Sequence, residues 1–334
     1  KIYLYDNPKL NLNYLPRNLT SFKPFEDTIK SIKKEKLIIP IEENINITEN
    51  TVLNKNLVLN LKKNQNLYLS NGATLVIFGD LQIEGDKSNR SKIEGLAPEY
   101  GSLILKGNTN NISNTIFKNL KAPNLKGFSL YGALNFINSE NYIIDTIFEK
   151  SHSEDFLNFI NSKTNLENIE LVNTASDAID VDAGKLKFIN LTCKDIGNDC
   201  LDFSNSEISG KNFFANNIQD KSISVGEKSK VEIENINLNN SEIAIAVKDS
   251  SKANISNIKI NNSTLPFAVF VKKSEYGPAY LKIDNLILNN SNDVFLVDKI
   301  STLEIDGKRI FGNLEGKNIE GMMYGNLYGK QTNR

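Results

Sequence analysis

The sequence is short of the residue types most often used in metal binding and nucleophilic catalysis: its 334 residues include one histidine and two cysteines. His152 is interpreted as a surface or hydrogen-bonded residue, since a lone histidine is more often that than a catalyst. Cys193 and Cys200 could form a disulfide only if their Cα atoms came within about 7 Å of each other. We interpret them instead as two small buried side chains that indicate no redox compartment.

The chain also lacks a net charge of either sign and a long apolar run. Its 39 Lys and Arg residues against 40 Asp and Glu residues give a net charge of −1, so no overall basic field favours nucleic acid or an anionic membrane. No apolar run approaches the roughly 20 residues of a membrane span. We therefore expect no nucleic-acid partner and no membrane span. Because the first residue is Lys1, we expect a processed chain or an excised part of a longer one. We expect the protein to be a monomer or part of a longer multidomain chain.

What the sequence does contain is a repeated phrase. In it, apolar and polar residues alternate, as in Ser176-Asp-Ala-Ile-Asp-Val-Asp. Five copies begin at residues 154, 176, 198, 220 and 242, so each offset is 22 residues (176 − 154 = 22). A fixed period of this length is typical of a solenoid in which each repeat is one coil. The sequence therefore predicts an all-β solenoid of about 22 residues per coil.

The pattern divides the chain into three parts. Residues 1–36 lack the repeat and are interpreted as a linker and N-terminal cap, with a short helix over residues 22–35. Residues 37–310 form the predicted β-helix, and the Gly-rich residues 311–334 are expected to be an irregular C-terminal cap or tail. A Pro- and Gly-containing insertion at residues 121–132 is interpreted as a surface loop, with one wall of a cleft as the alternative.

Asparagine recurs at the expected corners of the coils, as in Asn239-Asn240 and Asn261-Asn262. Asn tolerates the left-handed backbone and forms local hydrogen bonds, so we interpret these residues as structural.

Within the phrase, period-2 alternation turns residues such as Ile179 and Val181 inward and the residues between them outward. Because stacked strands lie about 4.8 Å apart, the outward residues form columns along the solenoid axis. The expected columns are Asp155–Asp177–Asp199–Lys221, Asn158–Asp180–Asp202–Ser224, Asp182–Ser204–Gly226–Lys248–Lys272 and Glu227–Asp249–Lys273. The sequence thus predicts an acidic ladder followed along the axis by lysines.

Carboxylates at this spacing repel one another unless a cation neutralises them or their pKa values rise. We therefore expect a functional site, with a solvated acidic stripe and structural ion pairs from Lys221 and Lys248 as the alternative. The expected catalytic residues are Asp177, Asp180, Asp199, Asp202 and Lys221. The expected substrate-binding residues are Asp155, Asn158, Lys248, Lys272 and Glu227. The expected metal ligands, for calcium, are Asp180, Asp182 and Asp202.

The segments Asn173-Thr-Ala-Ser-Asp, Gly197-Asn-Asp-Cys and Asp220-Lys-Ser-Ile-Ser-Val-Gly resemble the three catalytic coils of polygalacturonase-type glycoside hydrolases. The resemblance implies a right-handed parallel β-helix, in which Asp177 and Asp199 match two of the family's aspartates. Asn198 stands where that family has another carboxylate, and Asp220-Lys221 replaces its His-Gly. No arginine lies between Arg90 and Arg309, so lysines would hold the carboxylate of a uronate.

A second resemblance covers roughly residues 37–300. Gly132-Ala-Leu-Asn-Phe, Ile245-Ala-Val-Lys-Asp-Ser-Ser and Lys272-Lys-Ser-Glu-Tyr-Gly are similar to the β-helix segments beside CotH-like domains in bacterial surface proteins. It implies the same fold and no particular activity.

Three functions remain in view. The first is a polysaccharide lyase, hydrolase or epimerase that acts on a uronate-containing glycan outside the cell, at its surface or in the periplasm. The second is a non-catalytic polysaccharide-binding or structural surface module stabilised by calcium. The third, a tailspike-like or adhesin domain, requires trimer contacts along one face, and the sequence shows no long exposed apolar stripe for them.

Overall fold

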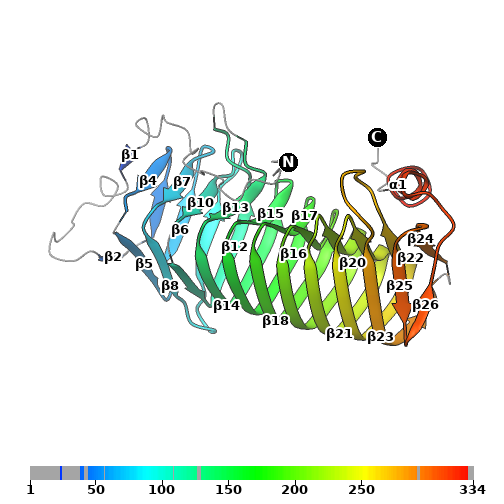
Figure 1. The fold of residues 1–334 in the computed structure, drawn as a ribbon. Coiled ribbons are helices and arrows are strands. Elements are labelled where there is room, and N and C mark those ends of the chain that lie inside the picture. Colours follow the sequence, from blue (N-terminus) through cyan, green and yellow to red (C-terminus); the bar gives the residue numbers. More distant parts are fainter. Residues whose placement is uncertain are drawn as a thin grey trace.

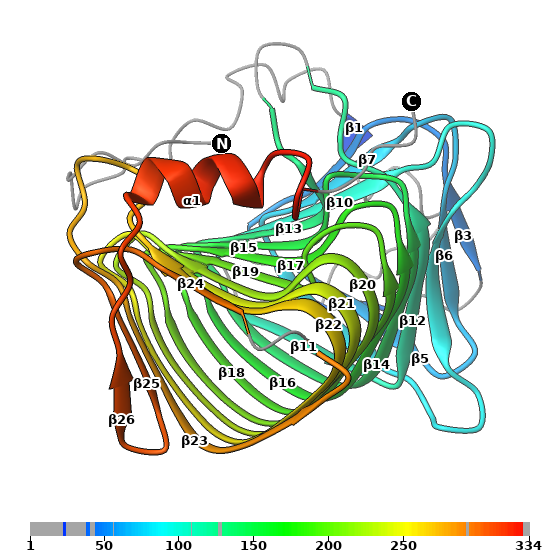
Figure 2. The same cartoon turned by 90° about the vertical axis from the view of Figure 1, so that its right-hand side faces the viewer.

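The computed structural model describes residues 23–24, 38–40 and 44–329, except residues 56, 108, 126–128 and 292–293. These residues wind into a single right-handed parallel β-helix, which confirms the fold expected from the repeat (Figure 1). Each coil places strands on three faces that enclose one apolar core (Figure 2).

The three faces are named here after one strand of each. The β13 face contains β1 (Lys23–Pro24), β4 (Thr51–Leu53), β7 (Thr74–Ile77), β10 (Ser102–Lys106), β13 (Gly132–Ile137), β15 (Asp155–Ile160), β17 (Asp177–Asp182), β19 (Leu201–Ser204) and β24 (Phe295–Val297). The β11 face contains β2 (Ile38–Pro40), β5 (Val58–Lys62), β8 (Asp80–Glu84), β11 (Thr109–Ser113), β23 (Tyr280–Asn289), β25 (Thr302–Ile305) and the antiparallel β26 (Lys308–Ile310). The β12 face contains β3 (Ile45–Ile47), β6 (Asn66–Leu69), β9 (Ser91–Gly95), β12 (Thr115–Leu120) and the second half of β23, which turns onto this face.

Six long strands bend around the corners and join faces. They are β14 (Glu140–Ser151), β16 (Lys163–Thr174), β18 (Lys185–Ile196), β20 (Glu207–Gly226), β21 (Lys230–Lys248) and β22 (Lys252–Phe270). The first three span the β11 and β12 faces, and the last three continue into the β13 face.

The register of neighbouring coils confirms the 22-residue repeat. Ile179 pairs with Leu201, and Leu201 pairs with Ile223. These three side chains, like Val181, are fully buried in the core. Apolar residues at alternate strand positions therefore fill the interior, as a period-2 pattern requires.

Stacked asparagines reinforce one corner of the coils, as expected. All of them have positive φ, which Asn adopts more readily than most residues. Each donates its side-chain amide to the asparagine of the preceding coil: Asn190 to Asn168 (2.7 Å), Asn212 to Asn190 (2.8 Å), Asn235 to Asn212 (3.2 Å), Asn257 to Asn235 (3.1 Å) and Asn285 to Asn257 (2.9 Å). Asn168 in turn donates to Asp145 Oδ1 at 3.0 Å. We call this row the asparagine ladder.

Both ends of the β-helix carry an element other than the one expected from the sequence. Within the expected N-terminal cap, Lys23–Pro24 form β1, paired with β4; the remaining residues of the cap and of its helix lie outside the described residues. At the C-terminal end, the expectation of an irregular tail is wrong for Gly316–Met323, which form helix α1. Ile319 and Met323, four residues apart on one side of the helix, are buried against Ala246 and Ala268 of the β13 face.

The outer side of the β13 face changes character along the axis. At the N-terminal end, Leu125 and Leu130 of the insertion pack with the outward apolar residues Val76, Ile104 and Ile160. At the C-terminal end, α1 lies across the face (Figure 2). Between these two covers, β15, β17, β19 and the ends of β20 and β21 present polar and charged outward residues. We call this segment the polar window; the insertion forms one of its borders.

Candidate functional site

The polar window contains the acidic ladder, and strand register confirms most of its columns. Asp155 pairs with Asp177, and Asn158 pairs with Asp180. Asp180 pairs with Asp202, and Asp202 with Ser224, while Asp182 pairs with Ser204 and Ser204 with Gly226. The first column continues through hydrogen bonds from backbone amides to carboxylates, from Asp199 to Asp177 (2.9 Å) and from Lys221 to Asp199 (3.0 Å).

One column assignment is wrong. Lys272 was expected to follow Lys248, but Lys248 pairs with Phe270. Lys272 lies two residues beyond the end of β22, where its backbone amide donates to Asp249 Oδ1 at 2.7 Å. The cause is that Lys272 stands 24 residues after Lys248, whereas these coils repeat every 22 (270 − 248 = 22).

The ladder is less exposed than a solvated stripe would be. Asp155, Asp177 and Asp199 are buried, and Asp180, Asp182 and Asp202 are only partly exposed. Asn158 links two columns, because its amide donates to Asp155 Oδ2 at 3.0 Å and to Asp180 Oδ2 at 3.1 Å. The carboxyls therefore form a packed, hydrogen-bonded cluster.

Burial and mutual repulsion shift the protonation of these groups. Burial raises the pKa of Asp155 to about 7, although the Asn158 hydrogen bond opposes the shift. Burial, with the neighbouring carboxylates Asp199 and Asp202, raises the pKa of Asp177 well above its usual value. Burial and the nearby Asp182 do the same for the pKa of Asp180. A carboxyl with a raised pKa keeps its proton to a higher pH than an exposed carboxyl does and can donate it.

Next along the axis, a buried lysine meets two carboxylates. The Lys221 Nζ lies 3.2 Å from Asp199 Oδ1 and 2.5 Å from Asp220 Oδ2. Burial raises the pKa of Asp199 to about 6, because Lys221 offsets only part of the desolvation. Burial lowers the pKa of Lys221, but Asp199 and Asp220 reverse this and hold the amine charged. Asp220 was not among the expected site residues, although it belongs to the repeated phrase.

Lys248 supplies a second buried ammonium group. Its Nζ donates to Ser224 Oγ at 2.9 Å, and its Cε lies 3.7 Å from where a Cβ would stand on Gly226. Burial opposes its charge, but Tyr324 and Asp202 raise its pKa above the usual range. Because Ser224 and Gly226 are small, the Lys248 side chain fits against them on the outer side of the β13 face.

The expected column of Glu227, Asp249 and Lys273 is confirmed as a cluster. Lys273 forms an ion pair with Glu227, and its backbone amide donates to Asp249 Oδ1 at 2.8 Å. Ser204 also donates to Glu227. Glu227 is therefore engaged at the strand end, and no contact places it beside the carboxyls of the first column in the described part of the chain.

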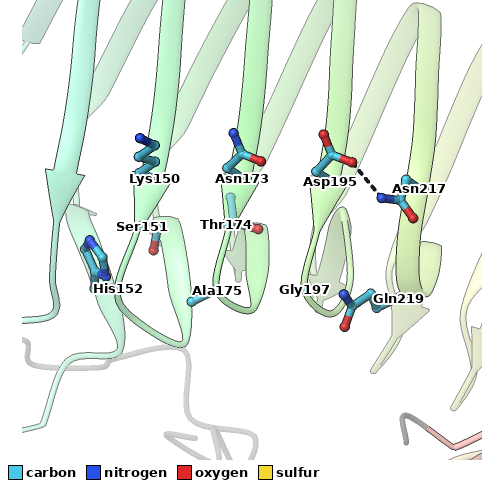
Figure 3. A pocket seen from close by; sticks show the side chains of 10 residues that line it. All are labelled: Lys150, Ser151, His152, Asn173, Thr174, Ala175, Asp195, Gly197, Asn217 and Gln219. Atoms are coloured by element: carbon cyan, nitrogen blue, oxygen red, sulfur yellow. Dashed lines mark hydrogen bonds between the residues drawn. The ribbon is translucent and has the colours of Figure 1, made fainter. Parts of the chain in front are cut away.

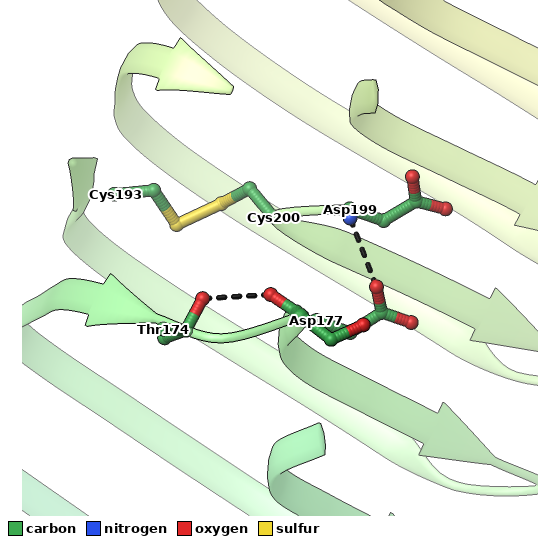
Figure 4. The surroundings of a disulfide bond; sticks show 6 residues. Thr174, Asp177, Cys193, Asp199 and Cys200 are labelled. Carbon is green, nitrogen blue, oxygen red and sulfur yellow. Dashed lines mark hydrogen bonds between the residues drawn. A yellow bond between two sulfur atoms is a disulfide. The ribbon is translucent and has the colours of Figure 1, made fainter. Parts of the chain in front are cut away.

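The cysteines form a disulfide, so the interpretation as free thiols is wrong. Cys193 and Cys200 have Cα atoms 6.3 Å apart within one coil. The bond lies next to the ladder, because Cys200 is the residue directly after Asp199 (Figure 4). The turn from β18 to β19 brings both residues together within one coil, so no contact between adjacent coils is needed.

Calcium at Asp180, Asp182 and Asp202 stays a prediction. Among the described residues, no three Asp, Glu, His or Cys side chains are arranged to hold a metal ion. Lys221 and Lys248 supply positive charge at the same face. The arrangement favours lysine compensation of the ladder, and no chemical step is assigned to a metal.

Sequence reasoning missed Tyr324, which follows α1 directly. The Nζ atoms of Lys272 and Lys221 lie 4.0 and 5.3 Å from the centre of its ring. No repeat could have indicated this residue, because it lies in the Gly-rich C-terminal segment outside the coil pattern.

A separate hollow of about 350 Å³ lies at the corner between the β12 and β13 faces (Figure 3). It is lined by residues of four successive coils, among them Asn173, Gly197 and Gln219, and by His152 at one end. His152 stacks on Tyr100 with ring centres 4.0 Å apart. The hollow includes none of the ladder carboxyls.

No protein-family model and no curated protein sequence matches the chain. Among solved structures, a double mutant of the periplasmic alginate epimerase AlgG matches with a TM-score of 0.51 at 12% identity, over 85% of this chain and 82% of the other. The gp42 tailspike of Acinetobacter phage vb_AbaP_AS12 matches with a TM-score of 0.50 at 9% identity, over 76% of this chain. An alginate lyase from Paenibacillus sp. FPU-7 matches with a TM-score of 0.42 at 10% identity, over 73% of this chain and 93% of the other.

This chain spans 59% of the tailspike's length. No helix in the described part of the chain is long and apolar enough to cross a membrane. The resemblance to segments beside CotH-like domains stays a prediction. At these identities, what the chain shares with the epimerase and the tailspike is the parallel β-helix fold.

Proposed function

We propose that the chain acts on a polysaccharide bound over the polar window, as a lyase, hydrolase or epimerase. The observation that carries the proposal is the cluster of stacked carboxyls with raised pKa values beside buried, charged lysines. Titratable groups driven this far from their usual state are typical of sites that transfer protons.

The cluster offers both partners of acid–base chemistry. Asp177 and Asp180, whose pKa values are raised by burial and by neighbouring carboxylates, supply a proton to a glycosidic oxygen or to carbon. Asp199, paired with Lys221, is the more readily ionised carboxyl and serves as the base. Asn158, which also donates to Asp155, holds Asp180 in place by a hydrogen bond.

Uronate as the sugar is supported by the lysines at the C-terminal side of the window. Lys248 and Lys272 have no arginine near them in sequence and are the cations available to a sugar carboxylate. The alginate epimerase with the same fold acts, by its name, on a uronate polymer. That likeness supports a glycan partner for this chain.

A location outside the reducing cytosol accompanies this function. The Cys193–Cys200 disulfide is typical of secreted, surface and periplasmic proteins. The alginate epimerase is described as periplasmic. We infer an extracellular, cell-surface or periplasmic site of action.

The test is turnover of a panel of uronate-containing and neutral polysaccharides by the parent and by Asp177→Asn and Asp199→Asn. We expect each variant to lose about 100-fold or more in kcat, the usual contribution of a positioned acid or base. Asp284→Asn, which removes a partly exposed ion pair with Lys282 on the β11 face, is the matched control. Parent-like turnover by both ladder variants would refute the catalytic proposal.

A second candidate is a non-catalytic polysaccharide-binding or structural surface module, as the resemblance to CotH-associated segments implies. The full pairing of Lys221 with Asp199 and Asp220 favours it, since buried ion pairs also serve purely structural roles. Binding of a glycan without turnover, unchanged in Asp177→Asn, would identify this module.

A further inference from the structure

Helix α1 fixes one aromatic residue over the lysine end of the ladder. Ile319 and Met323 anchor the helix on Ala246, Ala268 and Phe270 of the β13 face. Tyr324 comes immediately after Met323, so its ring position is set by a buried neighbour. Other parts of the chain do not cover Tyr324 completely, because 44% of its surface is exposed. A ligand over the polar window can therefore reach it.

Three lysines from successive parts of the solenoid surround this tyrosine. Lys272 Nζ lies 4.0 Å and Lys221 Nζ 5.3 Å from the ring centre. Lys248, held by Ser224, also interacts electrostatically with the phenol. A cation over an aromatic face is attracted to the ring. Three cations around one phenol hydroxyl also favour its ionised form.

The electrostatic consequence is a shift of the phenol toward the phenolate. Exclusion of water raises the pKa of Tyr324, but Lys248, Lys221 and Lys272 together outweigh this and lower it below its usual value. Lys221 and Lys248 remain charged beside Asp199, Asp220 and Asp202. The site therefore brings a phenol with a lowered pKa within a few coils of carboxyls with raised pKa values.

We propose that Tyr324 is the proton-accepting catalytic residue of the polar window, and that its substrate is a uronate-containing polysaccharide. This inference rests on the proposed function and deepens it: Tyr324, in place of Asp199, takes the proton, and Asp199 holds Lys221 beside the tyrosine. The three ammonium groups would receive the sugar carboxylate, while the phenol oxygen would face the carbon next to it.

The step balances with residues of this chain. The phenolate oxygen takes the proton from the carbon bonded to the uronate carboxylate, and the C–H electron pair moves into that carboxylate, where the lysines stabilise it. In elimination, this pair forms a carbon–carbon double bond, the bond to the glycosidic oxygen breaks, and the oxygen takes a proton from a neutral ladder carboxyl. In epimerisation, the carbon takes that proton on its opposite face and no bond to oxygen breaks.

The experiment compares Tyr324→Phe, Tyr324→Ala and the control Tyr328→Phe in the full chain, with alginate and polygalacturonate as probes. Tyr328 lies in the same segment, packed against the apolar cluster of α1. Ultraviolet absorbance of unsaturated uronate and deuterium uptake at the sugar carbon measure the two reactions. We expect Tyr324→Phe to lose about 100-fold or more in kcat with KM changed little, with its Tm kept, and Tyr328→Phe to match the parent.

Each other result has a distinct meaning. Parent-like kcat in Tyr324→Phe with raised KM in Tyr324→Ala would reduce the residue to a sugar-stacking role and overturn the inference. If Asp177→Asn is inactive in that case, the proposed function stands. Turnover of a neutral glycan only would overturn this inference, because its step needs the uronate carboxylate, and would leave the proposed action on a polysaccharide standing. Failure to turn over any polysaccharide would overturn both proposals.

Discussion

At the scale of single residues, the polar window works by placing ionisable groups where water cannot solvate them. Asp155 and Asp177 are buried on a face whose neighbouring coils repeat the same charge. The chain relieves that repulsion in two ways: some carboxyls keep a proton, and Lys221 forms ion pairs with others. The first demands a pH at which those carboxyls keep their protons, and the second demands the charged amine of Lys221.

The first demand concerns Asp155. Its pKa of about 7 in the folded state lies above the value of an exposed Asp, so the folded chain binds more protons than the unfolded chain between about pH 4 and 7. Its contribution to stability is therefore complete below pH 4 and is lost as pH rises to 7. We expect the free energy of unfolding to fall by up to about 1.4 kcal/mol per pH unit from this group.

Chemical denaturation across this pH range measures the effect, and Asp155→Asn should flatten the slope. An unchanged slope in Asp155→Asn, with Asp284→Asn as control, would show that the raised pKa is not that of Asp155.

The second demand concerns Lys221, which is only 3% exposed. Lys221→Met leaves Asp199 and Asp220 buried without their cation, and we expect a loss of about 3–5 kcal/mol of unfolding free energy. Lys185→Met breaks an exposed pair with Glu207 and should cost no more than about 0.5 kcal/mol. Equal losses in the two variants, measured by denaturant unfolding, would contradict a structural role for the buried pair.

At the scale of elements, α1 and the insertion at residues 121–132 bound the polar window because each packs on apolar residues that point outward from the β13 face. The β13 face presents Val76 and Ile104 at one end and Ala246 and Ala268 at the other. Covering these removes apolar area from water, at about 25 cal/mol per Å². The charged coils between them offer no such gain, so they stay without an apolar cover.

The helix can be strengthened without touching the site. Gly321 lies within α1, and a Cβ added there would meet no atom within 4 Å. Gly321→Ala should therefore stabilise α1 by about 0.5–1 kcal/mol, seen as a higher Tm. Gly210→Ala is the contrasting variant, because its Cβ would overlap the Phe188 ring and lower the Tm. A lower Tm in Gly321→Ala would mean that α1 does not pack on the β13 face as described.

How far the sequence predicts this structure depends on whether a feature repeats. Ile179, Leu201 and Ile223 recur every 22 residues, so their inward position and the register of their strands followed from spacing alone. Lys272 was misplaced because it stands 24 residues after Lys248, whereas the 22-residue spacing puts Phe270 in that column. Tyr324 and the Cys193–Cys200 bond depend on a helix and a turn that occur once, and a period carries no information about them.

At the scale of the whole molecule, each coil contacts mainly its neighbours, so charge must be balanced locally along the axis. The ladder of three coils is followed by coils that carry Lys221 and Lys248. Calcium, predicted from the sequence, and lysine compensation, favoured by the geometry, are two accounts of that balance.

Thermal unfolding in calcium and in EDTA separates them. With lysines as the counter-charges, calcium has no site to bind, and we expect the same Tm in both solutions. Calcium that bound only the folded state would instead raise the Tm with its concentration. A calcium-dependent rise that disappears in Asp182→Asn would instead establish the predicted calcium site, with Glu304→Gln near the C-terminal end as the control.

The asparagine ladder also gives the cylinder a direction. Every amide in it donates toward the preceding coil, so the side-chain dipoles point the same way and polarise one another. The positive pole of this row therefore lies at Asn168, where the carboxylate of Asp145 receives the last hydrogen. One acidic residue terminates an aligned string of neutral amides, much as an anion terminates the start of a helix.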